Sequence, residues 1–242
     1  MNSSIDNYSF ESSESKLAAK QFFTKVYAFM FGALIVSGLI AFQYGNEEFI
    51  MKYFINISPT GASLSPLFYV VIFSPLGVAF IMQRYLERLS FAALFGLFML
   101  YSVLIGFSLS TIFITYTDTS IFAIFGISAA TFGVMAIMGY VTSADLTKFG
   151  SILMMAFWGI MIAALINFFL ESEGFQYLIS IIGVLVFTGL TAYHMQQLKQ
   201  LAHNSTIDEE HKNKLALIGG FTLYILFVNL FVSLLRLFGS RD

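Results

Sequence analysis

Apolar residues run along this chain in seven long and nearly uninterrupted stretches. They cover Val26–Tyr44, Leu64–Met82, Phe91–Ile114, Ser120–Val141, Phe149–Leu170, Phe175–Leu198 and Leu215–Phe238. Each stretch is close to the roughly 20 residues that a helix needs to cross a bilayer core of about 30 Å. Strands of a membrane β-barrel would be about half as long and would alternate in polarity. We therefore expect an all-α integral membrane protein with seven transmembrane helices.

The composition supports a membrane protein. Of 242 residues, 58% are hydrophobic and only 11% are charged, and the mean hydropathy is +0.82. A typical soluble domain is about 45–50% apolar and about 25% charged. The net charge of −2 leaves no basic face for nucleic acid. The absence of cysteine excludes disulfides, thiolate metal sites and thiol nucleophiles.

Two regions follow from this pattern: a polar cytoplasmic N-terminal tail over residues 1–24 and a seven-helix transmembrane domain over residues 25–240. The orientation comes from lysine and arginine, which concentrate in cytoplasmic segments. With the N-terminus in the cytoplasm and the C-terminus outside, nine such residues lie inside and three outside. The nine are Lys16, Lys20, Lys25, Arg84, Arg88, Lys148, Lys199, Lys212 and Lys214.

His194 is the most informative polar residue within the spans. It shares a helical face with Thr188 and Thr191 near the cytoplasmic end of the sixth stretch. An ionisable group in a membrane is a functional candidate, because charging it in hydrocarbon costs a few kcal/mol. The alternative is a neutral imidazole that hydrogen-bonds to a neighbouring helix. In the second stretch, Pro75 removes one backbone hydrogen bond and is expected to kink the helix.

The inner loops contain two further candidates. Asp145 precedes the fifth stretch and is positioned to cap the free N–H groups of that helix. The loop Lys199–Lys214 is rich in acidic residues and histidine, but its spacing fits neither an EF-hand nor a zinc pattern. A solvated charged turn is the preferred interpretation of that loop, with a cation site as the alternative.

Sequence signatures of catalysis are absent. The chain has no Gly-rich phosphate loop, nucleophile elbow, His-Glu-x-x-His sequence or intramembrane pair of acids. We expect no catalytic residues, no cofactor-binding or metal site, and no enzymatic activity. An intramembrane hydrolase that pairs His194 with a serine is a remote third possibility.

Three segments carry a resemblance to a known family. They are Leu100–Phe113, Gly139–Gly150 and Leu223–Phe231, the last followed by Leu234–Gly239. In order and spacing they resemble the Bax inhibitor-1 family of multispanning membrane proteins, over about residues 20–240. The middle segment, Gly-Tyr-Val-Thr-Ser-Ala-Asp-Leu-Thr-Lys-Phe-Gly, is the most specific.

The resemblance implies a bundle in which the C-terminal helix is central, and a calcium leak that responds to pH. In the family pattern two aspartates, one in the sixth span and one in the seventh, share a proton or pair with an arginine. This chain has His194 and Leu226 at those positions, and Arg84 matches the arginine. Asn229 is a neutral polar group in the last helix. Histidine ordinarily titrates near pH 6.5 and could still sense protons.

The sequence and the resemblance therefore suggest two alternative functions. The first is a calcium leak channel whose gating or conduction is altered or lost, with calcium as the permeant ion, protons as the signal and no cofactor. The second is a non-conducting regulator of a membrane-bound ATP-dependent protease or another membrane partner, with the N-terminal tail as the contact. The bacterial style of the match favours the cytoplasmic (inner) membrane, with an internal membrane of a eukaryote as the alternative.

Overall fold

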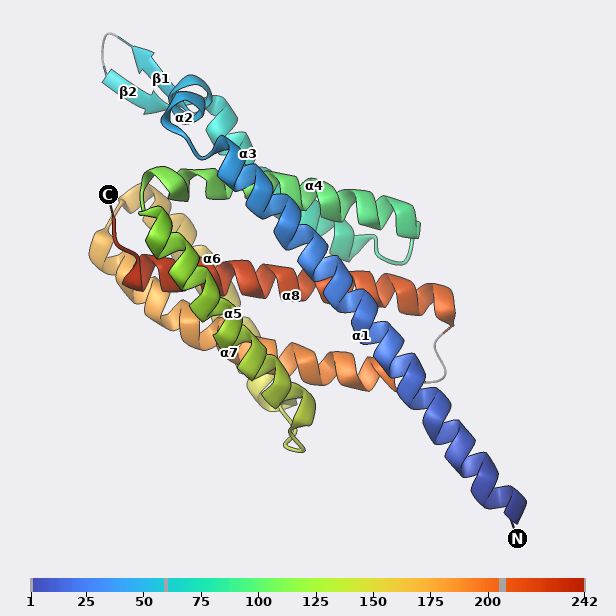
Figure 1. Ribbon diagram of the computed structural model, residues 1–242. Helices are drawn as coiled ribbons and strands as arrows, with labels where there is room; N and C mark the ends of the chain where they lie inside the picture. The colour runs from blue at the N-terminus through green and yellow to red at the C-terminus, as the bar shows by residue number, and fades with distance from the viewer. Residues whose placement is uncertain (1, 59–60, 205–207, 242) are drawn as a thin grey trace. The chain divides into compact units, whose positions relative to one another are not determined.

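A computed structural model describes residues 2–58, 61–204 and 208–241, with side chains from Lys16 onward. Within these residues, seven helices are long and apolar enough to cross a membrane, which confirms an all-α multi-pass membrane protein. The seven are α1 (Asn2–Tyr44), α3 (Pro66–Arg84), α4 (Phe91–Leu109), α5 (Asp118–Val141), α6 (Thr147–Leu170), α7 (Glu173–Ala202) and α8 (Glu209–Phe238) (Figure 1).

The structure adds several details to the sequence expectation. The helix α1 begins at Asn2 and includes the residues of the expected polar tail, whose cytoplasmic location stays a prediction. A short 3₁₀ helix, η1 (Ser110–Ile114), ends the third predicted span. Between α1 and α3 lie a short helix, α2 (Glu47–Tyr53), and a hairpin of β1 (Ile55–Ser58) and β2 (Gly61–Leu64). The two strands pair antiparallel, and the sequence analysis predicted neither strand.

Serine fixes the starts of several helices. Ser65, Ser90 and Ser172 precede α3, α4 and α7, and each side chain accepts a hydrogen bond from a backbone N–H in the first turn. The first N–H groups of a helix have no partner within the helix, so these oxygens satisfy one of them. The helices therefore begin where a short polar side chain precedes an apolar run.

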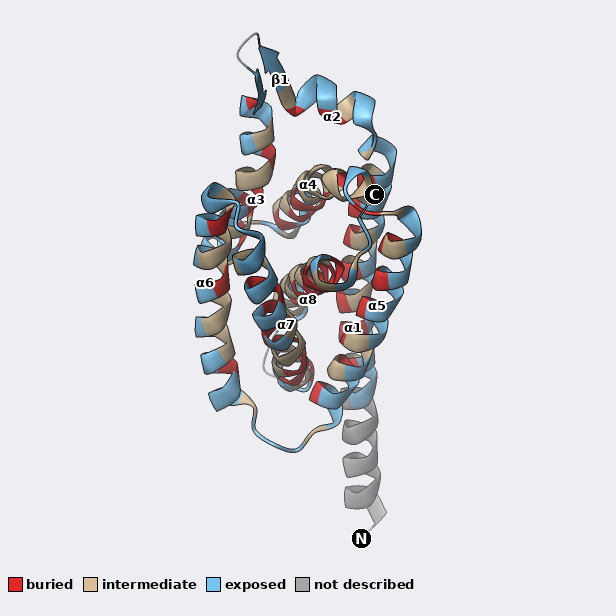
Figure 2. Ribbon diagram, turned by 90° about the vertical axis from the view of Figure 1, so that its left-hand side faces the viewer, coloured by how far each residue is buried: buried red, intermediate tan, exposed pale blue. Residues whose placement is uncertain are grey.

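The chain divides into two compact units, the first of which contains residues up to Phe29 and Ile124–Phe238. In this unit α6 packs on α7, and α7 packs on α8 (Figure 1). The two outer members of this series differ strongly in burial: 67% of the apolar window of α8 is buried, against 11% in α6 (Figure 2). Contacts with the rest of the protein therefore bury most of the apolar surface of α8. Most of the apolar surface of α6 is exposed and available to lipid. That α8 is central to the whole bundle stays a prediction.

The second unit contains Met30–Ala123 and the C-terminal residues from Gly239. Here α3 packs on α4. Pro75 lies inside α3 and has no N–H to donate to the carbonyl of Val71, four residues earlier. Ser108 of α4 compensates, since its hydroxyl lies 3.4 Å from the Val71 oxygen and 3.0 Å from that of Leu104. A neighbouring helix thus satisfies the carbonyl that proline leaves free.

Candidate functional site

A buried glutamine joins α7 to the connection between α5 and α6, within the first unit. The Nε2 of Gln196 donates a hydrogen bond of 2.7 Å to the carbonyl of Ala144, and its Oε1 accepts one of 2.9 Å from the N–H of Leu146. The glutamine is only 8% exposed. By pairing one backbone acceptor and one backbone donor of the loop, this side chain fixes the position of the loop. We call Gln196, Ala144 and Leu146 the Gln196 clamp.

Two glycines allow α7 to approach closely on either side of the clamp. A Cβ atom on Gly139 of α5 would overlap the backbone of Ala192. A Cβ atom on Gly150 of α6 would overlap the ring of Tyr193. Small residues let membrane helices approach backbone to backbone. The two glycines that bound the most specific family segment therefore make room for the part of α7 that carries the clamp.

A lysine makes a second connection between α7 and α5. The Nζ of Lys199 donates a hydrogen bond of 2.8 Å to the carbonyl of Tyr140 and lies 5.2 Å from the centre of its ring. The ring of Phe23, on α1, meets the same tyrosine edge to face at 5.3 Å. Tyr140 of α5 therefore contacts α1 through an aromatic pair and α7 through a carbonyl and a cation–π contact.

Asp145 lies in the same connection and is exposed. Its Oδ1 accepts bonds from the hydroxyl and the backbone N–H of Thr147, the first residue of α6, the latter at 2.9 Å. The hydroxyl bond first and the backbone bond second hold the pKa of the carboxyl below its ordinary value of 3.8. The N-cap position itself is Leu146, whose side chain makes no capping bond.

The predicted sensor, His194, lies two residues before Gln196 on α7 and is half-buried. The centre of its ring lies 5.2 Å from that of Tyr193. The Nε2 of Gln197 donates a hydrogen bond of 2.6 Å to the Tyr193 hydroxyl. The hydroxyl of Thr191, by contrast, is bonded to its own helix at the Phe187 carbonyl. The described ring contact of the imidazole therefore lies within α7 itself.

Two close contacts define how α7 and α8 face one another. A Cβ atom on Gly183 of α7 would lie 2.7 Å from the Oγ of Ser233 on α8. A Cβ atom on Gly219 of α8 would lie 2.6 Å from the Cδ2 of Leu198 on α7. From the first contact to the second, the residue number increases along α7 and decreases along α8. The two helices are therefore antiparallel, and both contacts agree on which residues lie opposite one another.

This register places His194 and Leu226, the two family aspartate positions, on adjoining helices but at different heights along the helix axes. With a constant rise per residue, His194 falls level with Thr222, about one turn from Leu226. Leu226 is 3% exposed and belongs to the buried face of α8. Asn229 donates its amide N–H to the carbonyl of Ile225 at 2.8 Å, within its own helix. The two family positions therefore lie on helices that pack together, about one turn apart.

Arg84 is the last residue of α3 and belongs to the second unit. It is exposed, and its guanidinium carbon lies 5.9 Å from the centre of the Tyr85 ring. Among the residues with described side chains, no group of three His, Asp, Glu or Cys side chains is placed to hold a metal ion.

The sequence analysis missed Gln196 as a site residue. The available signal was an amide inside the apolar stretch Phe175–Leu198, since such a group must find a partner away from water. Nothing in the sequence indicated that this partner is the backbone of a loop some fifty residues earlier in the chain.

This protein is similar to known proteins over nearly its whole length. The family model described as Inhibitor of apoptosis-promoting Bax1 matches residues 19–242. A protein of Borreliella burgdorferi is 39% identical over 225 residues, which cover 93% of this chain and 94% of the relative. The Escherichia coli K12 protein named Inner membrane protein YbhL is 36% identical over 230 residues, 94% of this chain and 95% of the relative. A membrane protein of Streptococcus pyogenes serotype M6 is 33% identical over 235 residues, 95% and 96% of the two chains. The resemblance in the three sequence segments is thereby confirmed, and the chain belongs to the Bax inhibitor-1 family.

Proposed function

We propose that this protein is a calcium leak of the bacterial inner membrane in which His194 provides the response to pH. Calcium is the permeant ion, and the mechanism needs no cofactor and no enzymatic step. In this proposal the Gln196 clamp and the N-terminus face the cytoplasm and the C-terminus lies outside, as the lysine and arginine distribution predicts. The inner membrane is where the name of the Escherichia coli relative places that protein.

The observation that carries the proposal is the position of His194 beside the clamp. The imidazole is half-buried and lies two residues from the glutamine that fixes α7 to the α5–α6 loop. Protonation places a positive charge at this point, which repels a divalent cation. It also favours arrangements in which the ring reaches water, because a charge in hydrocarbon costs a few kcal/mol. We therefore expect acid to reduce the flux of calcium.

The distribution of acidic residues supports a histidine, rather than a pair of carboxylates, as the group that senses protons. In α7 and α8, aspartate and glutamate occur only in the first turns, as Glu173, Glu209 and Glu210. The family position at Leu226 carries a buried apolar side chain. Proton sensing by two carboxylates that share a proton therefore has no acidic groups available deep in these helices.

Calcium flux into liposomes that contain the purified protein tests the proposal at pH 6 and pH 8. The wild type should pass less calcium at pH 6 than at pH 8, and His194→Ala should lose this difference. His203→Ala is the matched control, since that exposed histidine ends the same helix, and it should retain the difference. Absence of flux at both pH values would contradict the leak.

A second candidate is a regulator that acts by contact on a membrane-bound ATP-dependent protease. The observation that favours it is the length of α1, which has 43 residues where about 20 suffice to cross a bilayer. Deletion of residues 2–15 spares the span that begins at Lys16. If this candidate is correct, the deletion should change the half-life of a protease substrate in cells, and the liposomes should show no flux.

A further inference from the structure

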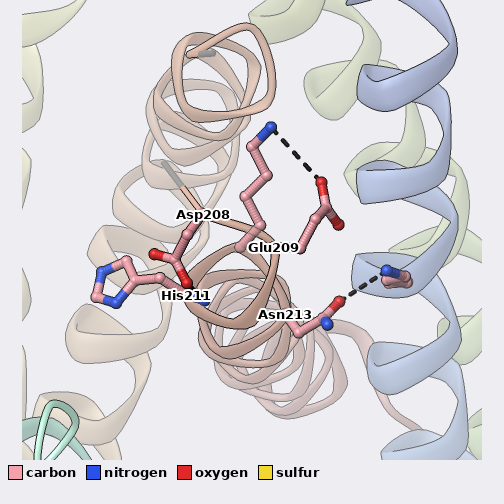
Figure 3. A network of polar contacts seen from close by, with 6 residues as sticks. Asp208, Glu209, His211 and Asn213 are labelled. Carbon is pink, nitrogen blue, oxygen red and sulfur yellow. Dashed lines mark hydrogen bonds and ion pairs between the residues drawn. The ribbon is translucent and has the colours of Figure 1, made fainter. Parts of the chain in front are cut away.

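A polar contact joins α1 and α8 within the first unit. The Nζ of Lys25 donates a hydrogen bond of 2.7 Å to the Oδ1 of Asn213 (Figure 3). Lys25 directly precedes the apolar run that begins at Val26, and Asn213 lies two residues before the run that begins at Leu215. Both side chains therefore lie where hydrocarbon gives way to the headgroup region of a bilayer.

The surroundings of this contact form a small hollow of mixed charge. Two ammonium groups, one carboxylate, two amides and one aromatic ring line it, from Lys25, Lys212, Glu209, Gln21, Asn213 and Phe22. The Nζ of Lys212 lies 3.9 Å from the carboxylate of Glu209, the limit of an ion pair. The Lys212 side chain is 16% exposed and that of Glu209 is 77% exposed. The hollow thus places an accessible carboxylate directly beside ammonium groups.

These groups retain hydrogen-bonding capacity. An ammonium has three N–H donors, and the bond to Asn213 uses one of those on Lys25. The exposed carboxylate of Glu209 has two acceptor oxygens. The side chains of Asp208 and His211 do not face the hollow, since Figure 3 shows both on the opposite side of α8 from Asn213. Their own contact runs from the His211 N–H to the Asp208 carboxylate.

We propose that this hollow binds the headgroup of a phospholipid that carries a primary ammonium. The phosphate lies against Lys25 and Lys212, and the ammonium donates hydrogen bonds to Glu209. A trimethylammonium headgroup offers the same phosphate but has no N–H for the carboxylate. An anionic glycerol headgroup has no cation to place there. The inference concerns a site apart from His194 and does not depend on calcium conduction.

Native mass spectrometry of the purified protein tests this inference with three lipids of identical acyl chains: phosphatidylethanolamine, phosphatidylcholine and phosphatidylglycerol. Phosphatidylethanolamine should be retained over phosphatidylcholine by about two- to fivefold, the range expected from one exposed ion pair. Glu209→Gln should abolish this preference. The double variant Lys25→Gln, Lys212→Gln should weaken all three lipids.

The neighbouring ion pair provides the matched control. Lys214 and Glu210 lie 3.4 Å apart on the same turns of α8 but do not line the hollow. Glu210→Gln should therefore keep the preference of the wild type. Equal retention of the ethanolamine and choline lipids, or the same result for Glu209→Gln and Glu210→Gln, would overturn the inference. Displacement of the lipid by soluble phosphoethanolamine at equal concentration would also overturn it, because the site would then serve a soluble ligand.

Discussion

Gln196 and Leu146 are joined by a hydrogen bond of 2.9 Å between a side-chain oxygen on α7 and a backbone N–H at the start of α6. The same amide reaches the carbonyl of Ala144. One side chain therefore satisfies both a donor and an acceptor of the α5–α6 connection. The position of that connection depends on α7 rather than on its own sequence alone.

Removal of the amide should release this connection. In Gln196→Leu both backbone groups lose their side-chain partner, at a cost of about 0.5–1.5 kcal/mol for each hydrogen bond. Hydrogen exchange of the loop between α5 and α6 should accelerate, as measured by mass spectrometry. Gln200→Leu, at an exposed position on the same helix, should leave exchange unchanged. Equal exchange in wild type and Gln196→Leu would contradict the clamp.

A methyl group at Gly139 should destabilise the protein. The added carbon would overlap the backbone of Ala192, which cannot move aside as a flexible side chain can. Overpacking of this kind costs about 1–3 kcal/mol. Thermal unfolding in detergent should show a lower midpoint for Gly139→Ala. Gly133→Ala on the same helix meets no atom within 4 Å and should leave the midpoint unchanged or raise it.

The Asp145 carboxylate should contribute stability in a defined pH window. Its folded pKa lies below 3.8 because Thr147 donates two hydrogen bonds to the charged form. The contribution is therefore present above the unfolded pKa and is lost as the pH falls through the folded pKa. The melting temperature of Asp145→Ala should lie below that of the wild type at pH 6, and the gap should narrow below about pH 4. A gap that is constant from pH 6 to pH 3 would contradict this role.

Aspartates at the two family positions should show whether side chains at positions 194 and 226 can meet although they lie about one helical turn apart. Leu226→Asp puts an unpaired carboxyl into a buried position, at a cost of about 3 kcal/mol. If the side chains bridge one turn, His194→Asp combined with Leu226→Asp should recover part of this loss at pH 6, where two carboxyls can share a proton. Thermal unfolding of the single and double variants measures the recovery. A double variant no more stable than Leu226→Asp would show that the two positions do not meet.

The hydropathy pattern predicts the seven spans because a bilayer imposes one length on every helix that crosses it. The starts of α3, α4 and α7 follow from Ser65, Ser90 and Ser172, which are visible in the sequence. The hairpin of β1 and β2 was missed, since its strands of four residues lie in a connection with no length constraint.

The candidate site could be predicted only in part. The motif Gly139–Gly150 was found, but its partners Ala192, Tyr193 and Gln196 were not, because contacts between membrane helices depend on shape and on single polar groups. His194 was singled out by its chemistry and by its place in the family pattern. Its ring contact with Tyr193 lies within the same helix, and no pattern of hydropathy indicates that contact.

Ser108 also constrains how the second unit can rearrange. If α4 slid away from α3, the Val71 carbonyl freed by Pro75 would lose its donor and face hydrocarbon. We therefore expect an added cost for separating the two helices during any opening of the protein, which favours their moving together. Spin labels attached one to each helix should report a single, unchanging separation while labels elsewhere record movement.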